Sequence, residues 1–197
     1  MNLQPAVFLD RDGTINEQMG YINHLSRFQL LPGVGRAIRS LNALGLPVVV
    51  ATNQSGLGRG YFPDALLDEV HAEMQRLLAL EGARLDAIYV CPHHPEAKVE
   101  RYRQDCDCRK PRPGLLVQAA ADLHLDLTRS YVVGDRWSDL RCGAAVGAAT
   151  ILVLTGYGRG EACYIGPHQQ VQPTHVAEDL VAAAAWIASR EQQGRAV

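Results

Sequence analysis

Short apolar runs alternate with longer amphipathic stretches along most of the chain. Five runs are apolar at nearly every position, a pattern typical of strands that are buried on both faces of a parallel sheet. These predicted strands are Ala6–Leu9, Val48–Ala51, Ala87–Cys91, Tyr131–Val133 and Thr150–Leu154.

The stretches between the predicted strands carry apolar residues at helical spacing, with proline or glycine near several ends. The predicted helices are Val34–Leu44, Pro63–Glu81, Pro113–Leu123 and Ser138–Val146, followed by an alanine-rich helix at about Ala177–Arg190. The terminal Gln192–Val197 is expected to fray. Strands that alternate with helices predict an α/β fold with a Rossmann-like, doubly wound parallel sheet. A length of 197 residues fits a single domain over residues 1–197.

Composition and charge exclude several classes of partner. The 19 basic and 21 acidic residues leave a formal net charge of −2, which offers no broad basic field for nucleic acid or an acidic membrane. No apolar run approaches the roughly 18 residues of a membrane span, and the N-terminus lacks the pattern of a signal peptide. We therefore expect a cytoplasmic monomer with neither a nucleic-acid nor a membrane partner.

Two carboxylates stand directly after the first predicted strand. Asp10 and Asp12 are two positions apart, so their side chains can converge on one reacting centre where the strand ends. Like charges this close repel each other, and the repulsion is relieved by a divalent cation or by using one acid as nucleophile and the other as proton carrier. An acidic turn after a buried strand is the alternative interpretation.

Polar residues follow other predicted strands as well. In an open parallel sheet, ligands bind beyond the carboxyl ends of the strands. Thr52–Gly56 follows the second strand and Gly134–Asp139 follows the fourth, while Lys110 precedes the third predicted helix and can reach the same crevice. Turn chemistry alone does not explain four such elements in this order.

The segments Asp10–Thr14, Thr52, Lys110 and Gly134–Asp139 resemble the motifs of the haloacid dehalogenase superfamily of phosphatases, over about residues 6–155. The chain lacks the helix-sized insert that other members use as a cap, which suggests an open site for a small phosphate ester. The resemblance implies that Asp10 is a nucleophile that forms an aspartyl-phosphate, and that Asp12 serves as general acid and then general base.

The same resemblance implies a metal and a phosphate site. The Mg²⁺ ion is expected on the Asp10 carboxylate, the Asp12 main-chain carbonyl and Asp135, because this hard ion prefers oxygen ligands. Thr52 and Lys110 are expected to bind the phosphoryl oxygens. Asp139 is expected to orient water or a basic neighbour instead of binding the metal.

A second cluster carries the ligand types of zinc. Cys91, His93, Cys106 and Cys108 supply three thiolates and one imidazole, a common set for a closed, structural Zn²⁺ site in a reducing compartment. The predicted zinc loop covers about residues 91–110. His94 competes with His93, which is preferred because the similar phosphatases have Cys-x-His. Reduced cysteines in an ordinary loop are the alternative.

Within the superfamily, the chain is similar to phosphatases of heptose bisphosphates. The similarity implies that a small-molecule sugar bisphosphate is the substrate and that its 7-phosphate is removed, a step toward the nucleotide-heptoses of bacterial surface glycans. The residues expected to contact the substrate are Gln18, Met19, Gly20, Tyr21, Thr52, Asn53, Gln54, Ser55, Arg109, Lys110 and Arg136.

Two alternatives to this substrate stay open. Met19 and Arg136 depart from the histidine and lysine expected at these positions, and Gly-Asp-Arg-x-x-Asp is also similar to histidinol-phosphate phosphatases. Ser55 favours a sugar, because histidinol phosphatases tend to have an aspartate there. The other alternative is a non-catalytic module that binds phosphosugars, although such a module has no need of Asp12.

Overall fold

A single parallel sheet runs through the computed structural model, which describes residues 3–195. The strands of the sheet are β1 (Val7–Leu9), β2 (Val48–Asn53), β3 (Ala87–Cys91), β4 (Tyr131–Gly134), β5 (Ala149–Val153) and β6 (His175–Ala177). These six strands lie in the order β3-β2-β1-β4-β5-β6. β1 pairs with both β2 and β4, so that Val7 faces Val48 on one side and Tyr131 on the other. The predicted parallel, doubly wound sheet is confirmed.

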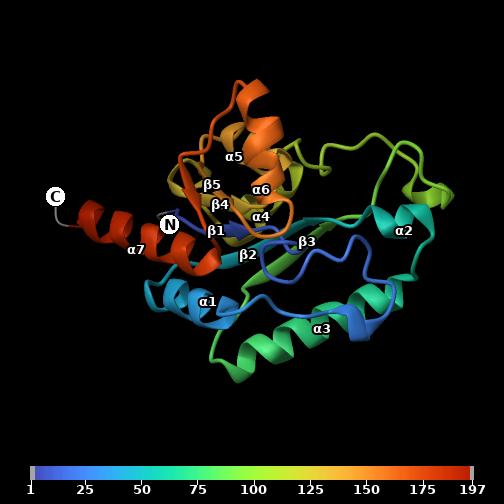
Figure 1. Cartoon of the computed structure of the whole chain (residues 1–197), viewed down its shortest axis with the longest axis horizontal. Helices are drawn as coiled ribbons and strands as arrows, with labels where there is room; N and C mark the ends of the chain where they lie inside the picture. The colour runs from blue at the N-terminus through green and yellow to red at the C-terminus, as the bar shows by residue number, and fades with distance from the viewer. Residues whose placement is uncertain (1–2, 196–197) are drawn as a thin grey trace.

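Helices cover both faces of this sheet. Figure 1 shows α1, α3 and α7 on one side, and α4 and α5 on the other. The helices are α1 (Val34–Ala43), α2 (Ser55–Arg59), α3 (Asp64–Leu80), α4 (Gly114–Leu123), α5 (Trp137–Ala144), α6 (Gly158–Gly160) and α7 (Leu180–Arg195).

Alternation along the strands divides the core into two layers. Val7 and Leu9 point into the layer with α1, α3 and α7, whereas Phe8 between them points into the layer with α4 and α5. Successive side chains of a strand face opposite sides of a sheet. All three are fully buried, and this accounts for the uninterrupted apolar runs in the sequence.

The C-terminal region differs from the prediction. Ala177 ends β6 instead of beginning a helix, and the final helix starts at Leu180, where the Asp179 carboxylate accepts the Ala182 N–H at 2.9 Å. β6 escaped the prediction because it is a three-residue edge strand with an exposed Val176. The helix also continues to Arg195, so the fraying expected from Gln192 is wrong as far as that residue. Ala196 and Val197 lie outside the described residues.

The strand order reverses beside β1, and this position places the candidate site. The carboxyl ends of β1 and β4 meet there, at the switch point where open α/β sheets bind ligands.

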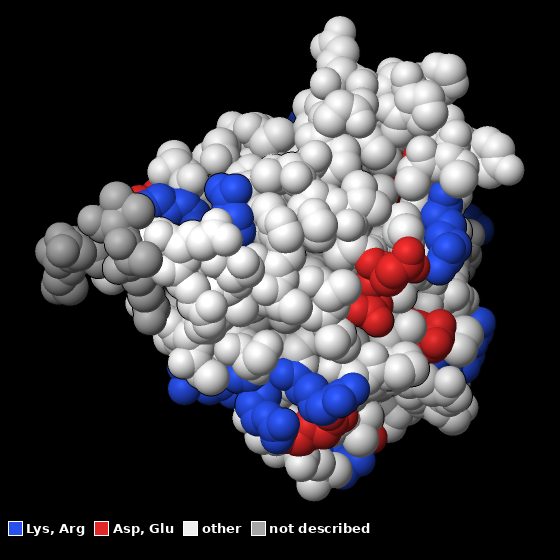
Figure 2. Space-filling model, turned by 60° about the vertical axis from the view of Figure 1, so that its left-hand side comes forward, with Lys and Arg blue, Asp and Glu red and all other residues white. Residues whose placement is uncertain are grey.

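Acidic and basic side chains are interspersed on the face shown in Figure 2. Within residues 3–195, no helix combines the length and the apolar character that crossing a membrane requires.

Candidate active site

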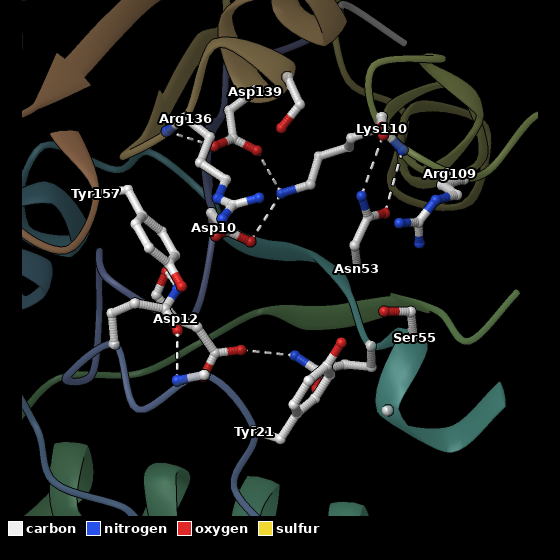
Figure 3. A pocket seen from close by; sticks show the side chains of 15 residues that line it. Asp10, Asp12, Tyr21, Asn53, Ser55, Arg109, Lys110, Arg136, Asp139 and Tyr157 are labelled. Atoms are coloured by element: carbon white, nitrogen blue, oxygen red, sulfur yellow. Dashed lines mark hydrogen bonds and ion pairs between the residues drawn. The ribbon is translucent and has the colours of Figure 1, made fainter. Parts of the chain in front are cut away.

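A buried lysine joins two carboxylates beyond the end of β1. Lys110 Nζ lies 2.7 Å from Asp10 Oδ1 and 2.6 Å from Asp139 Oδ1 on α5, and it also donates to the Ala51 carbonyl oxygen at 2.7 Å (Figure 3). Burial raises the pKa of Asp10 to about 6 although Lys110 opposes the shift. Burial alone lowers the pKa of Lys110, but the two carboxylates outweigh it and raise that pKa. The lysine is therefore charged, and Asp10 is mostly ionised at neutral pH.

Asp135, which follows β4, keeps one carboxylate oxygen available. Its Oδ2 accepts the Tyr157 N–H at 2.8 Å, whereas its buried Oδ1 has no hydrogen-bond partner among residues 3–195. Burial, followed by the charge of Asp10, raises the pKa of Asp135 to about 8. Asp10, Asp135 and Asp139 offer oxygen atoms within 4.8 Å of one another. An unpartnered buried oxygen beside a second carboxylate fits a divalent cation, which both relieves the repulsion and takes the free oxygen.

Two glycines allow the loops after β1 and β5 to reach Asp135. Gly13 has φ of +86° and Gly156 has φ of +54°, both in the left-handed region. A Cβ atom at Gly13 or Gly156 would lie only 2.1 or 2.2 Å from Asp135 Oδ2. Thr155 Oγ1 also donates to the Gly13 carbonyl at 2.6 Å. Larger side chains at either glycine are therefore incompatible with this position of the carboxylate.

Asp12 is held by an arginine and two amides. Arg11 Nη2 donates to both Asp12 oxygens at 3.0 and 2.8 Å, while Asn16 and Gln54 donate at 3.0 and 2.8 Å. Burial alone raises the pKa of Asp12, but Arg11 and the amide hydrogen bonds outweigh it, and this pKa lies below its usual value. His71 on α3 lies 3.2 Å from Arg11 Nη1, and burial together with Arg11 lowers the pKa of His71 to about 4. A neutral His71 can therefore accept a hydrogen bond from Arg11.

Asp10, Asp12 and Asp139 line an open pocket, which Arg109 and Arg136 border (Figure 3). The predicted site residues that line it are Asp10, Asp12, Gln18, Gly20, Tyr21, Asn53, Gln54, Ser55, Arg109, Lys110 and Arg136. Gly56, Ser138, Asp139 and Tyr157 line it as well.

Some predicted residues support other residues of the site. Thr52 is buried, and its Oγ1 accepts from Gln54 Nε2 at 2.9 Å, so Thr52 helps to orient the amide that contacts Asp12. The Asn53 amide donates to the Lys110 carbonyl and accepts from the Lys110 N–H, both at 3.1 Å. Met19 packs against the apolar core. Thr52, Met19 and the predicted metal ligand Asp135 are not among the described residues that line the pocket.

The four predicted zinc ligands come together at the end of β3, where Cys91 lies, and in the loop between β3 and α4, which holds the other three. Cys108 Sγ lies 3.1 Å from Cys91 Sγ and 3.2 Å from Cys106 Sγ, and His93 Nδ1 lies 3.3 Å from Cys108 Sγ. Their ligand atoms all lie within 4.8 Å of one another. The competing His94 instead has its Nε2 atom 3.1 Å from Arg59 Nη2. Burial raises the pKa of Cys91 and of Cys108, whereas hydrogen bonds with Cys108 and Cys91 outweigh burial and lower the pKa of Cys106. A bound cation would favour the ionised form of all three thiols.

Three comparisons relate the chain to known proteins. Residues 107–183 match a family model described as HAD-hyrolase-like, HAD being haloacid dehalogenase. The chain is 47% identical over 153 residues to the D-glycero-beta-D-manno-heptose-1,7-bisphosphate 7-phosphatases of Salmonella typhi and Escherichia coli strain K12. The match covers 77% of this chain and 81% and 80% of those proteins. The chain belongs to the family of heptose-bisphosphate phosphatases in the haloacid dehalogenase superfamily.

Solved structures of this family have the same fold. The crystal structure of D,D-heptose 1,7-bisphosphate phosphatase from B. bronchiseptica, complexed with magnesium and phosphate, superposes with a TM-score of 0.84 at 37% identity, covering 95% of this chain and 99% of that chain. The corresponding enzyme from Burkholderia thailandensis gives a TM-score of 0.70 at 34% identity, covering 94% and 99% of the two chains. The resemblance to haloacid dehalogenase phosphatases is thus confirmed, and this chain is a phosphatase.

Some residues of this phosphatase site were not found from the sequence. Arg11 stands between the two acids of the motif, and a basic residue in this place is the signal that could have indicated a pair. The structure buries Arg11 and pairs it with Asp12. The pairing of Asp139 with Lys110 agrees with the predicted role of orienting a basic neighbour. Tyr157 follows the fifth strand in a glycine-rich stretch, and its position after a strand end is the signal that could have placed it at the site.

Proposed function

We propose that this chain is a Mg²⁺-dependent phosphomonoester hydrolase that removes the 7-phosphate of D-glycero-D-manno-heptose 1,7-bisphosphate, for the synthesis of nucleotide-heptoses and surface glycans. The observation that carries the chemistry is the ionised Asp10 carboxylate, held 2.7 Å from the buried Lys110 ammonium and beside the free oxygen of Asp135. The assignment of this substrate is supported by the relatives at 47% identity, which are heptose-1,7-bisphosphate 7-phosphatases.

Asp10 is the proposed nucleophile. One of its oxygens accepts from Lys110 Nζ, which orients the carboxylate, and the pocket opens in front of it. A carboxylate oxygen of Asp10 forms a bond to phosphorus while the bond from phosphorus to the sugar oxygen breaks. Water then attacks the resulting aspartyl-phosphate, which releases inorganic phosphate and regenerates Asp10. Lys110 supplies positive charge where the transition state spreads negative charge.

Asp12 is the proposed proton carrier, and its surroundings set when it takes up a proton. Arg11 and Gln54 keep Asp12 ionised before substrate binds, because they hold its pKa below the usual value. A phosphate dianion next to this carboxylate raises the pKa of Asp12 by repulsion. Asp12 therefore gains a proton as the substrate enters, gives it to the departing sugar oxygen, and takes a proton from the attacking water.

The residues that would hold Mg²⁺ are the Asp10 carboxylate, the Asp12 main-chain carbonyl and Asp135. The free Asp135 oxygen supports this assignment, as does the magnesium and phosphate bound to the neighbour from B. bronchiseptica. When bound, the ion supplies positive charge that lets the Asp10 carboxylate approach an anionic phosphate. Asp139 is already engaged, since Lys110 and the Arg136 N–H occupy its two oxygens.

The rim of the pocket supports a substrate with two phosphates. Arg109 and Arg136 line the opening in addition to Lys110 beside the nucleophile. An arginine fork can donate two hydrogen bonds to a phosphate that is not being transferred. Ser55 also lines the pocket with a neutral hydroxyl, which is suited to a sugar better than to the ammonium group of histidinol.

A comparison of substrates tests this assignment. We expect a higher kcat/KM for heptose 1,7-bisphosphate than for fructose 1,6-bisphosphate or histidinol phosphate, because the relatives at 47% identity are heptose-1,7-bisphosphate 7-phosphatases and histidinol phosphate has no second phosphate for the rim arginines. Release of inorganic phosphate is measured for all three under one set of Mg²⁺ and pH conditions. A preference for histidinol phosphate would overturn the heptose assignment and leave the phosphatase chemistry intact.

We also propose a structural Zn²⁺ ion held by Cys91, His93, Cys106 and Cys108. The convergence of these three sulfur atoms and one imidazole nitrogen supports the site, and four protein ligands would leave no position for substrate. Arg109 Nη1 donates to the His93 carbonyl at 3.1 Å, so the metal would also fix an arginine of the pocket rim. Thiolate ligands need a reducing compartment, which supports a cytoplasmic location.

Loss of one thiolate tests the zinc site. We expect the wild type to hold about one zinc per chain by atomic absorption, and Cys108→Ser to lose the metal and unfold at lower temperature. Cys163→Ser is the matched control, because Cys163 is an exposed cysteine outside the cluster. Equal zinc content in Cys108→Ser and Cys163→Ser would contradict the proposal.

We also propose that the chain acts as a single domain, because the residues that line the pocket come from loops and helix starts at one edge of one sheet.

A further inference from the structure

The loop after β5 brings a tyrosine ring to the rim of the active-site pocket. Tyr157 lines the pocket with 42% of its surface exposed, and the guanidinium carbon of Arg136 lies 4.2 Å from the centre of its ring (Figure 3). An aromatic face attracts a cation above it, while the N–H groups at the edge of the guanidinium stay able to donate. The ring therefore restrains a long, exposed side chain at the pocket opening.

The main chain of the same loop serves a different purpose. The Tyr157 N–H donates to Asp135 Oδ2, Gly156 packs against Asp135, and Thr155 Oγ1 bonds to the loop after β1. None of these contacts uses the tyrosine ring. A substitution of the Tyr157 side chain therefore leaves the support of Asp135 in place, and the effect of the ring can be measured separately.

The two arginines of the rim are thus restrained by different parts of the fold. Arg109 is anchored by the His93 carbonyl in the cysteine loop, and Arg136 lies on the ring of Tyr157. A side chain that is ordered in advance loses less entropy when it binds an anion. Arg136 is exposed, and an arginine side chain has many rotamers. The contact with the Tyr157 ring therefore strongly reduces the number of conformations that this side chain samples.

We propose that Tyr157 is a positioning residue that orders Arg136 for the phosphate that the substrate retains, and that it thereby favours a bisphosphate over a monophosphate. This inference rests on the proposed function, since it needs a substrate with a second phosphate. The reacting phosphate is expected at Asp10 and Lys110. Within residues 3–195, no hydrogen bond or ion pair joins the Tyr157 ring to either of these side chains. Tyr157 therefore acts on recognition and not on the chemical step.

A double-mutant cycle tests the pair. KM and kcat are measured for heptose 1,7-bisphosphate and for heptose 7-phosphate, with the wild type, Tyr157→Leu, Arg136→Ala and the double variant. We expect Tyr157→Leu to raise the KM for the bisphosphate about three- to five-fold more than the KM for the monophosphate, with kcat changed less than about two-fold. In the Arg136→Ala background, Tyr157→Leu has no further effect on the ratio of the KM for the bisphosphate to the KM for the monophosphate. Tyr157→Phe keeps the aromatic face and restores the wild-type ratio.

A control variant keeps the outcomes distinct. Tyr164→Leu removes a tyrosine that is 77% exposed and lies in the following segment, and it leaves the ratio unchanged. Equal increases in KM for both substrates, additive effects of the two substitutions, or a collapse of kcat in Tyr157→Leu would each overturn the inference. Failure of the proposed function shows separately, as a wild type that does not prefer the bisphosphate over the monophosphate.

Discussion

Asp10→Asn is expected to lower kcat for phosphate release by roughly 10⁴-fold or more. The amide has almost the same shape as the carboxylate, but its oxygen is a poor nucleophile and cannot form the aspartyl-phosphate. The measurement is release of inorganic phosphate from the heptose bisphosphate in the presence of Mg²⁺. In the wild type, rapid quenching and mass spectrometry should also detect phosphate bound covalently to the peptide that contains Asp10.

Asp12→Asn separates proton transfer from nucleophilic attack. We expect it to lower kcat by about 10²- to 10⁴-fold, the usual contribution of a general acid or base. Asp68→Asn is the matched control for both variants, because Asp68 is an exposed aspartate on α3. If the wild type, Asp10→Asn and Asp12→Asn release phosphate at one rate, the assigned chemistry is wrong. If none of them releases phosphate while all bind phosphosugars, the chain is a binding module.

Lys110→Met is expected to lower both activity and stability. The lysine is buried between Asp10 and Asp139, and removal of one partner from a buried ion pair costs about 3–5 kcal/mol because the remaining charges are uncompensated. Urea unfolding of the metal-free protein measures the loss. Lys98→Met, which removes an exposed lysine from the loop before α4, is the matched control and should change stability by less than about 0.5 kcal/mol.

The buried carboxyl groups of Asp10 and Asp135 determine the direction in which the stability of the metal-free protein changes with pH. In the folded wild type, the pKa of Asp10 is raised to about 6 and the pKa of Asp135 to about 8. The folded state therefore holds protons that these carboxyl groups release near pH 4 in the unfolded state. These two carboxyl groups therefore lower the stability of the metal-free protein as the pH rises from about 4 to about 8, although His71, whose pKa is lowered to about 4, opposes part of this fall below about pH 6.5. In Lys110→Met the carboxyl pKa values rise further, so the loss is larger at pH 8 than at pH 5. A loss that is independent of pH would contradict the pairing.

The positions of the acids in the site could be predicted from the sequence because these residues follow strand ends. Asp10 and Asp135 follow β1 and β4, two strands whose apolar runs are unmistakable, and a parallel sheet brings their carboxyl ends to one edge. The cysteine loop could be predicted because its ligand types and spacing are specific. In both cases the chemistry is carried by residues close in sequence to a strongly patterned element.

Other parts of the site depend on contacts that no local pattern encodes. Thr52 was expected to contact substrate, yet it is buried, lies outside the pocket lining and accepts a hydrogen bond from Gln54. Gln54 lines the pocket but also donates to Asp12, a contact that the sequence did not indicate. Arg11 reaches His71 on α3, sixty residues away in sequence. β6 was missed because a short edge strand is buried on only part of its surface and lacks a continuous apolar run. Side-chain pairing of this kind is decided by the packing of distant elements.

The long sequence separation of the site's contacts has a consequence for synthesis of the protein. Asp10 pairs with Lys110 across 100 positions, and Gly13 bonds with Thr155 across 142. A chain that is still growing on the ribosome cannot hold its first acid and its ammonium group together before both have emerged, and the loop that supports Asp135 emerges later still. Prematurely terminated products that end before this loop should therefore be inert toward cellular phosphate esters.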